Sequence, residues 1–187
     1  VYVLLLNADG TVKSSTKIAS DTNGGPTLAN GDSFGRSVAS VGDLDGDGVT
    51  DLAVGARGDD TGGQGTDRGA VHVLLLNTDG TVKSSTKIAH QVNGGPTLAN
   101  RDFFGSSVSS VGDLDGDGVP DLAVGAYGDE TGGEGSYHGA VHVLLLNVDG
   151  TVKSSLKIAS DTGGGPTLAT TDYFGSSVTN LGDLDGD

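Results

Sequence analysis

Apolar residues occur in short runs that alternate with polar segments rich in glycine. The runs at 52–56 and 70–76 are apolar at almost every position, which predicts strands that are covered on both faces. The runs at 34–42 and 81–88 alternate between apolar and polar residues, as expected for strands with a solvated face. Residues 77–80, Asn-Thr-Asp-Gly, are typical of a hairpin turn. The pattern therefore predicts a four-stranded antiparallel meander, with the lysines of the last run on an outer edge.

This pattern repeats along the chain with a period of 70 residues, so that the 187 residues hold about two and two-thirds copies. A faithful repeat of this kind indicates an array of one structural unit. We expect four segments: the last two strands of a unit with a connection (1–33), two complete units with their connections (34–103 and 104–173), and the first strand of a further unit with a truncated acidic loop (174–187).

The repeat and the strand pattern together predict an all-β chain that forms part of a β-propeller. Identical sheets that stack face to face around an axis cover both faces of each inner strand, and four-stranded blades of this kind build propellers. A β-sandwich is the alternative, but it covers one face of each sheet and does not require a repeat. The sequence therefore favours a partial ring of four-stranded blades.

Composition narrows the possible partners and the setting. The formal net charge of −15 argues against nucleic acid. The chain has no cysteine for a disulfide framework, and no run approaches the roughly 20 apolar residues that span a bilayer. The lack of methionine, together with ends that fall inside predicted elements, leads us to expect an internal piece of a longer protein.

The connection between the first and second predicted strands is an acidic nonapeptide that occurs three times. Aspartates at positions 1, 3, 5 and 9, with a glycine at position 6, place several hard oxygen ligands on one tight loop, which favours Ca²⁺. We expect the four side chains and the carbonyl at position 7 to bind the ion. The candidate ligands are Asp43, Asp45, Asp47, Val49 and Asp51, then Asp113, Asp115, Asp117, Val119 and Asp121, and finally Asp183, Asp185 and Asp187.

The third loop lacks positions 7 and 9, so we expect firm binding only in the first two. We interpret the calcium as structural, because it neutralises carboxylates that otherwise repel one another. Weak sites of this kind fill in millimolar calcium, which favours an extracellular setting.

Two other sequence features are weaker indications of a functional site. Arg57-Gly58-Asp59 is a tripeptide that some adhesion receptors recognise, but the next copy does not keep it. His72 and His142 share one repeat position with Tyr2, which indicates strand residues and not zinc ligands.

Short motifs recur around each acidic loop. They are Phe34-Gly35, Asp43–Asp51 and Gly55-Ala56, then Phe104-Gly105, Asp113–Asp121 and Gly125-Ala126, and finally Phe174-Gly175 with Asp183–Asp187. Together these motifs resemble the FG-GAP repeat of the integrin α-subunit N-terminal propeller and its bacterial relatives. A departure from the pattern is that Arg57 and Tyr127 stand where the repeat usually has proline.

The resemblance implies a seven-bladed propeller, calcium in the hairpins of some blades, and a secreted or cell-surface module for adhesion or ligand binding without catalytic activity. The expected partners are the neighbouring blades and a protein or carbohydrate ligand. Two alternatives stay open: an accessory propeller attached to an extracellular enzyme, or a spacer that presents other domains. Differences between copies, which a ligand site needs, fall mainly at 57–68, 90–93 and 100–103.

Overall fold

The computed structural model describes residues 1–61, 63, 66–133, 135 and 137–182, and these residues form strands and connections without any helix. Within this part of the chain there is accordingly no helix of the length and apolarity needed to cross a membrane. The strands are β1 (Tyr2–Leu6), β2 (Val12–Lys17), β3 (Phe34–Gly42), β4 (Asp51–Ala56), β5 (Ala70–Leu76), β6 (Val82–Ala89), β7 (Ser107–Gly112), β8 (Asp121–Ala126), β9 (Ala140–Leu146) and β10 (Val152–Ala159).

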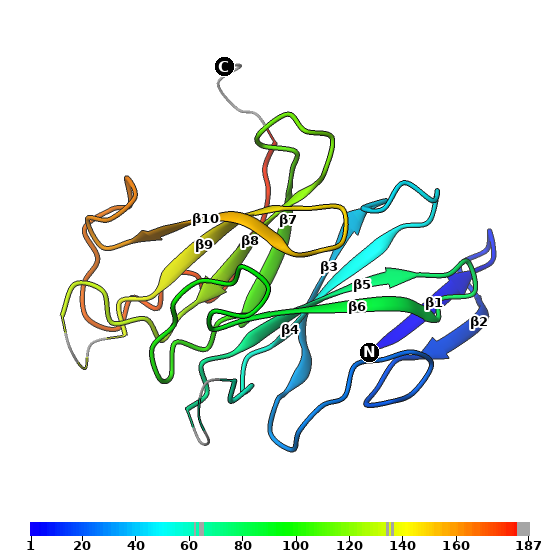
Figure 1. The fold of residues 1–187 in the computed structure, drawn as a ribbon, viewed down its shortest axis with the longest axis horizontal. Coiled ribbons are helices and arrows are strands. Elements are labelled where there is room, and N and C mark those ends of the chain that lie inside the picture. Colours follow the sequence, from blue (N-terminus) through cyan, green and yellow to red (C-terminus); the bar gives the residue numbers. More distant parts are fainter. Residues whose placement is uncertain (62, 64–65, 134, 136, 183–187) are drawn as a thin grey trace.

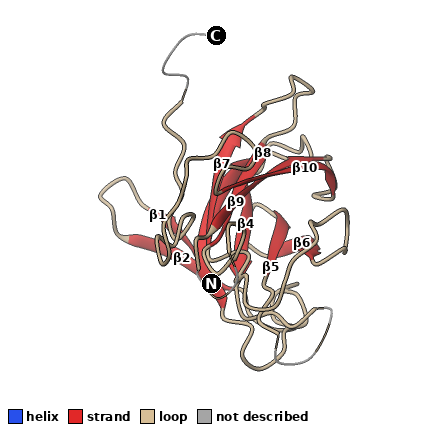
Figure 2. Ribbon diagram, turned by 90° about the vertical axis from the view of Figure 1, so that its left-hand side faces the viewer, coloured by secondary structure: helices blue, strands red, loops and turns tan. Residues whose placement is uncertain are grey.

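The strands form two complete four-stranded sheets and one two-stranded hairpin (Figure 1). The first blade has the order β3-β4-β5-β6 and the second the order β7-β8-β9-β10, while β1 pairs with β2. Every pairing is antiparallel and joins strands that follow one another in the chain. Figure 2 shows the same strand-and-loop architecture from the side. The predicted meander and its repetition are thus confirmed, as an arc of blades that does not close into a ring.

The hairpin turn at the outer edge of the first blade follows from its sequence. The Gly80 amide donates to the Asn77 carbonyl at 2.9 Å, and the Asp79 carboxylate accepts the Thr81 amide at 2.9 Å. Gly80 has a φ of 78°, in the left-handed region that glycine adopts without a steric cost. The same hydrogen bonds recur in the other two copies, so local chemistry sets this turn.

The core lies between the sheets, and β5 occupies its centre. All seven residues of β5 are buried. On one face, Val73 belongs to an apolar cluster that includes Leu122 and Leu144 of the second blade. On the other face, Leu74 packs in a cluster with Ile18, which follows β2. Both faces of this strand are therefore covered, as its continuous apolar pattern predicts.

The first strands of the copies differ more than their sequences suggest. β3 begins at Phe34, whereas β7 begins only at Ser107, and Phe104 instead forms an isolated parallel bridge with Gly69. Phe174 forms the same bridge with Gly139. The strand expected after residue 174 is absent from 174–182. In the two complete blades the first strand pairs with the strand that follows the acidic loop, and residues 183–187 of the third loop lie outside the described part of the chain. The division into four segments stays a prediction.

One face of the first hairpin is apolar and uncovered. Tyr2, Leu4 and Leu6 are 62%, 50% and 58% exposed, whereas Leu74 and Leu76 on the equivalent face of β5 are buried. Sheet faces of this kind favour association between chains. The arc therefore presents a surface that suits another sheet.

We expect residues 1–187 to form oligomers in sedimentation velocity experiments, in a concentration-dependent manner. The double substitution Leu4→Thr and Leu6→Thr replaces apolar side chains with polar, β-branched ones that favour a strand, and it should shift the population toward monomer. Leu114→Thr is the matched control, because Leu114 is 56% exposed but lies in an acidic loop. A parent chain that stays monomeric at high concentration contradicts this prediction.

Candidate metal centre

The two described acidic loops occupy the same place in adjacent blades. One joins β3 to β4 and the other joins β7 to β8 (Figure 1). Within the first loop, the Asp43 carboxylate accepts the amides of Asp47 at 2.9 Å and Gly48 at 2.8 Å. In the second loop, the Asp113 carboxylate accepts the amides of the equivalent residues at 3.1 and 2.8 Å. The first aspartate of each loop therefore organises the turn as well as facing the site.

The glycine at position 6 is required by its backbone angle. Gly48 and Gly118 have φ values of 85° and 88°, which side chains rarely adopt. A Cβ at either residue would meet no atom within 4 Å outside its chain neighbours. Close packing around the loop is therefore not the reason for glycine here.

The last aspartate of each loop is buried and tied to the sheet. The Asp51 carboxylate accepts the Leu44 amide at 2.9 Å and the Leu76 amide at 2.8 Å, and only 1% of the residue is exposed. Burial raises the pKa of Asp51 above its usual value. Asp121 makes the same two types of hydrogen bond. Each carboxylate oxygen retains a lone pair, so that this structural role is compatible with binding a cation.

Carboxylates gather in both loops in a manner that fits a hard divalent cation. Oxygens of Asp43, Asp45 and Asp51 lie within 4.8 Å of one another. In the second loop, oxygens of the first three aspartates, Asp113, Asp115 and Asp117, also lie within 4.8 Å of one another. Clustered carboxylate oxygens are the donors that Ca²⁺ and Mg²⁺ prefer. The donor set therefore fits the ion that the sequence predicts.

The complete ligand set stays a prediction. Asp47 and Asp121 lie outside these two groups. Asp183, Asp185 and Asp187 lie outside the described residues. The side chains at position 7 pack inward: Val119 is buried, and Val49 packs against a core cluster.

A lysine from the outer strand of each blade reaches into its acidic loop, which sequence reasoning missed. The Lys83 ammonium contacts both Asp45 and Asp47, and Lys153 contacts Asp115 and Asp117 in the same way. Hydrogen bonding from Lys83 holds the pKa of Asp47 below its usual value. The edge lysines therefore act as internal counter-ions, and each faces the carboxylates that would bind a cation.

The lysines should weaken cation binding, because the ion must enter beside a positive charge. We expect Lys83→Met with Lys153→Met to bind Ca²⁺ about fivefold more tightly in calorimetric titrations, since each substitution removes a positive charge beside the site that the cation must enter. Lys13→Met is the matched control, because Lys13 occupies the same repeat position (83 − 13 = 70) but precedes both complete loops. Affinity that is unchanged or lower in the double variant contradicts this role.

The tripeptide at 57–59 is not displayed as a recognition motif. Asp59 is 3% exposed and forms an ion pair with Lys87. His72 and His142 are buried in strands, and burial lowers the pKa of each to about 4. Neither histidine belongs to a metal-binding group of described residues.

The acidic loops and the Phe-Gly pairs that precede them decide the family. Residues 34–74 and 104–144 both match the sequence model of the FG-GAP repeat. Each match begins at the phenylalanine, includes the acidic loop and ends within the third strand of the blade. The chain contains two FG-GAP repeats.

Integrin α-subunits are among the relatives of this FG-GAP chain. Integrin alpha-5 of Xenopus laevis is 41% identical over 98 residues, which is 52% of this chain and 9% of the integrin. Integrin alpha pat-2 of Caenorhabditis elegans is 35% identical over 127 residues, or 68% of this chain and 9% of the relative. Integrin alpha-E of Mus musculus is 33% identical over 114 residues, which is 60% of this chain and 9% of the integrin. The chain thus spans about a tenth of the length of these relatives.

Proposed function

We propose that this FG-GAP chain is part of a calcium-stabilised β-propeller that mediates adhesion or ligand binding in a secreted or cell-surface protein. The observation that carries the proposal is the pair of acidic loops at one position in successive FG-GAP repeats, each with converging carboxylates. The similarity to integrin α-subunits supports the adhesion setting.

Calcium suits these loops better than magnesium. Each loop offers several carboxylates and a backbone carbonyl from one short, glycine-rich segment, and Ca²⁺ accepts six to eight oxygens with flexible geometry. Magnesium demands near-octahedral geometry and keeps several waters. The role of the ion is structural: it draws the first aspartates of the loop toward the last one, which is tied to the third strand of the blade.

We further propose that the propeller itself has no catalytic activity. The clustered aspartates of the acidic loops are accounted for as cation ligands and not as catalytic groups. Integrin α-subunits are among the relatives of the chain. An accessory role beside an extracellular enzyme is the second candidate, and a catalytic domain elsewhere in the full-length protein would favour it. The ligand in either case is a protein or a carbohydrate, with nucleic acid disfavoured by the negative charge.

Calorimetric titration with Ca²⁺ tests the metal assignment. We expect two binding sites per chain for the parent, one site for Asp45→Asn or for Asp115→Asn, and none for the double variant. Asparagine keeps the size of the side chain and removes its charge, so that the loss reports on ligation. The assignment fails if the double variant still binds two ions.

A further inference from the structure

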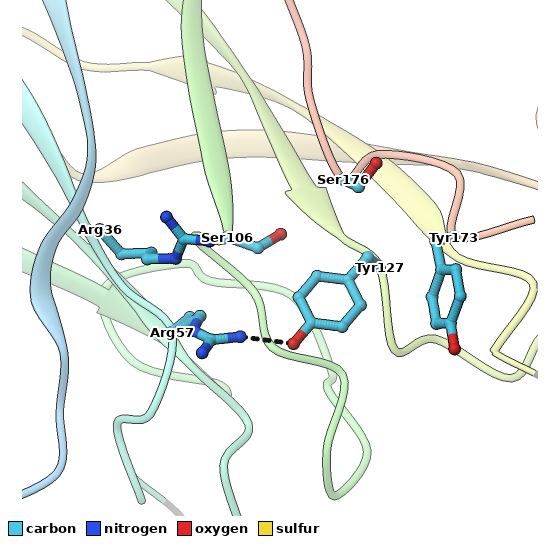
Figure 3. A pocket seen from close by; sticks show the side chains of 6 residues that line it. All are labelled: Arg36, Arg57, Ser106, Tyr127, Tyr173 and Ser176. Atoms are coloured by element: carbon cyan, nitrogen blue, oxygen red, sulfur yellow. Dashed lines mark hydrogen bonds between the residues drawn. The ribbon is translucent and has the colours of Figure 1, made fainter.

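A pocket of about 320 Å³ lies at the junction of the two complete blades, away from the acidic loops. Arg57 and Tyr127 line it and directly follow β4 and β8, whereas the acidic loops directly precede these strands. The pocket is therefore at the opposite end of the blades from the candidate metal centre. Its lining residues are Arg36, Arg57, Ser106, Tyr127, Tyr173 and Ser176 (Figure 3).

The pocket is built from positions at which the otherwise similar copies differ. Arg36 is replaced by serine at 106 and 176, and Arg57 by tyrosine at 127. Ser33 is replaced by Phe103 and Tyr173. The acidic loops, in contrast, repeat almost without change. The blades are therefore chemically distinct at this end, as a site for a particular ligand requires.

Two arginines give the pocket a positive wall. The Arg57 guanidinium donates to the Tyr127 hydroxyl at 2.5 Å and lies 5.7 Å from the centre of the Phe103 ring. Arg36 lines the same pocket, and Figure 3 shows both arginine side chains. Neither arginine forms a salt bridge with a described residue, although the chain carries a net charge of −15. Two neighbouring guanidinium groups without a carboxylate partner favour an anion, and their planar donors match a carboxylate.

The opposite wall is aromatic and carries hydroxyl groups. The Tyr173 ring stacks on Tyr137 with centroids 6.0 Å apart and an interplanar angle of 26°. Tyr173 is nevertheless 41% exposed. The Ser106 hydroxyl donates to the Gly125 carbonyl at 3.0 Å, which leaves its oxygen lone pairs free to accept a bond. An aromatic surface beside hydroxyl donors and acceptors suits a ring that has both apolar and polar edges.

We propose that this pocket binds an acidic sugar, namely a uronic acid unit of an anionic polysaccharide. The carboxylate binds between Arg36 and Arg57, the sugar ring packs against Tyr173, and the serine hydroxyls bond to the ring hydroxyls. An aspartate or glutamate side chain supplies the same carboxylate but no ring for the aromatic wall. The proposal rests on the ligand-binding role inferred above, and it names the class of ligand.

Calorimetric titration of the chain, in buffer with calcium, tests this with three probes: a hyaluronan tetrasaccharide, neutral cellotetraose and a pentaglutamate peptide. We expect saturable binding of the hyaluronan tetrasaccharide, with the other two probes at least tenfold weaker. Binding of cellotetraose with equal affinity overturns the role of the arginines, and tighter binding of the peptide overturns the sugar in favour of an acidic protein segment. Absence of binding by all three overturns the proposal altogether.

Variants separate the contributions of the two walls. Arg36→Gln and Tyr173→Ala change exposed residues. Each should weaken the binding of the hyaluronan tetrasaccharide at least tenfold, while the midpoint temperature of thermal unfolding stays the same. Lys13→Gln is the control and should leave the affinity unchanged. Loss of affinity in the control as well would indicate binding through general charge and overturn the site. The calcium titration measures a different site, so a chain that binds none of the three probes can still bind two calcium ions. The two proposals can therefore fail independently.

Discussion

Gly55→Ala should disrupt the contact between the complete blades and lower the free energy of unfolding by about 3 kcal/mol or more. A Cβ at Gly55 would lie 2.0 Å from the Gly105 carbonyl oxygen and 2.3 Å from the Ser37 hydroxyl oxygen. The obstructing backbone cannot move easily, because the Gly105 amide donates to the Gly125 carbonyl at 3.0 Å and its carbonyl accepts the Ser37 hydroxyl at 2.9 Å. Urea unfolding measures the loss.

Two controls isolate this contact. Gly125→Ala creates the equivalent clash, 1.8 Å from the Gly175 carbonyl oxygen, which likewise accepts a serine hydroxyl, that of Ser107, at 2.7 Å. Gly105, however, leads directly into β7, whereas Gly175 is followed by a segment, 176–182, without a strand. That segment can shift away, so we expect a loss of only about 1 kcal/mol. Ser37→Ala removes one hydrogen bond and should also cost about 1 kcal/mol. If Gly55→Ala is no more destabilising than either control, the blades are not held by this close approach.

Removal of calcium should lower the free energy of unfolding by about 5 kcal/mol. A site with a dissociation constant of about 10 μM in about 1 mM calcium contributes roughly 2.7 kcal/mol, and there are two complete loops. The double variant Asp45→Ala and Asp115→Ala should lose the calcium-dependent part of its stability. Urea unfolding with calcium and with excess chelator measures this difference. A double variant whose stability still depends on calcium as in the parent refutes the assignment.

The order and pairing of the strands were predictable because the same pattern of apolar runs and turn residues repeats every 70 residues. The run at 70–76 is apolar at nearly every position, and the structure covers both of its faces. Phe104 shows where this reasoning stops: its Phe-Gly pair is identical to that at Phe34, yet it pairs with Gly69 and not within a strand. The difference depends on the neighbouring blade, which local sequence does not describe.

The candidate metal loops were also visible in the sequence, because all their carboxylates lie within nine residues. The lysine that faces each loop was not, since 36 residues separate Lys83 from Asp47 and only the folding of the blade brings them together. The pocket at the other end was still harder to find. Its residues come from two blades and from the segment after β10, and they share no motif.

The most direct test of the calcium assignment is diffraction from crystals grown with Ca²⁺, with anomalous scattering used to locate the ion. We expect one peak in each complete loop, about 2.3–2.6 Å from its ligand oxygens. In the first loop these oxygens belong to the side chains of Asp43, Asp45, Asp47 and Asp51 and to the carbonyl of Val49. The lysine of each blade should then have left the aspartates that it contacts here. Loops without a peak at saturating calcium, with the lysines still between the carboxylates, would contradict the account.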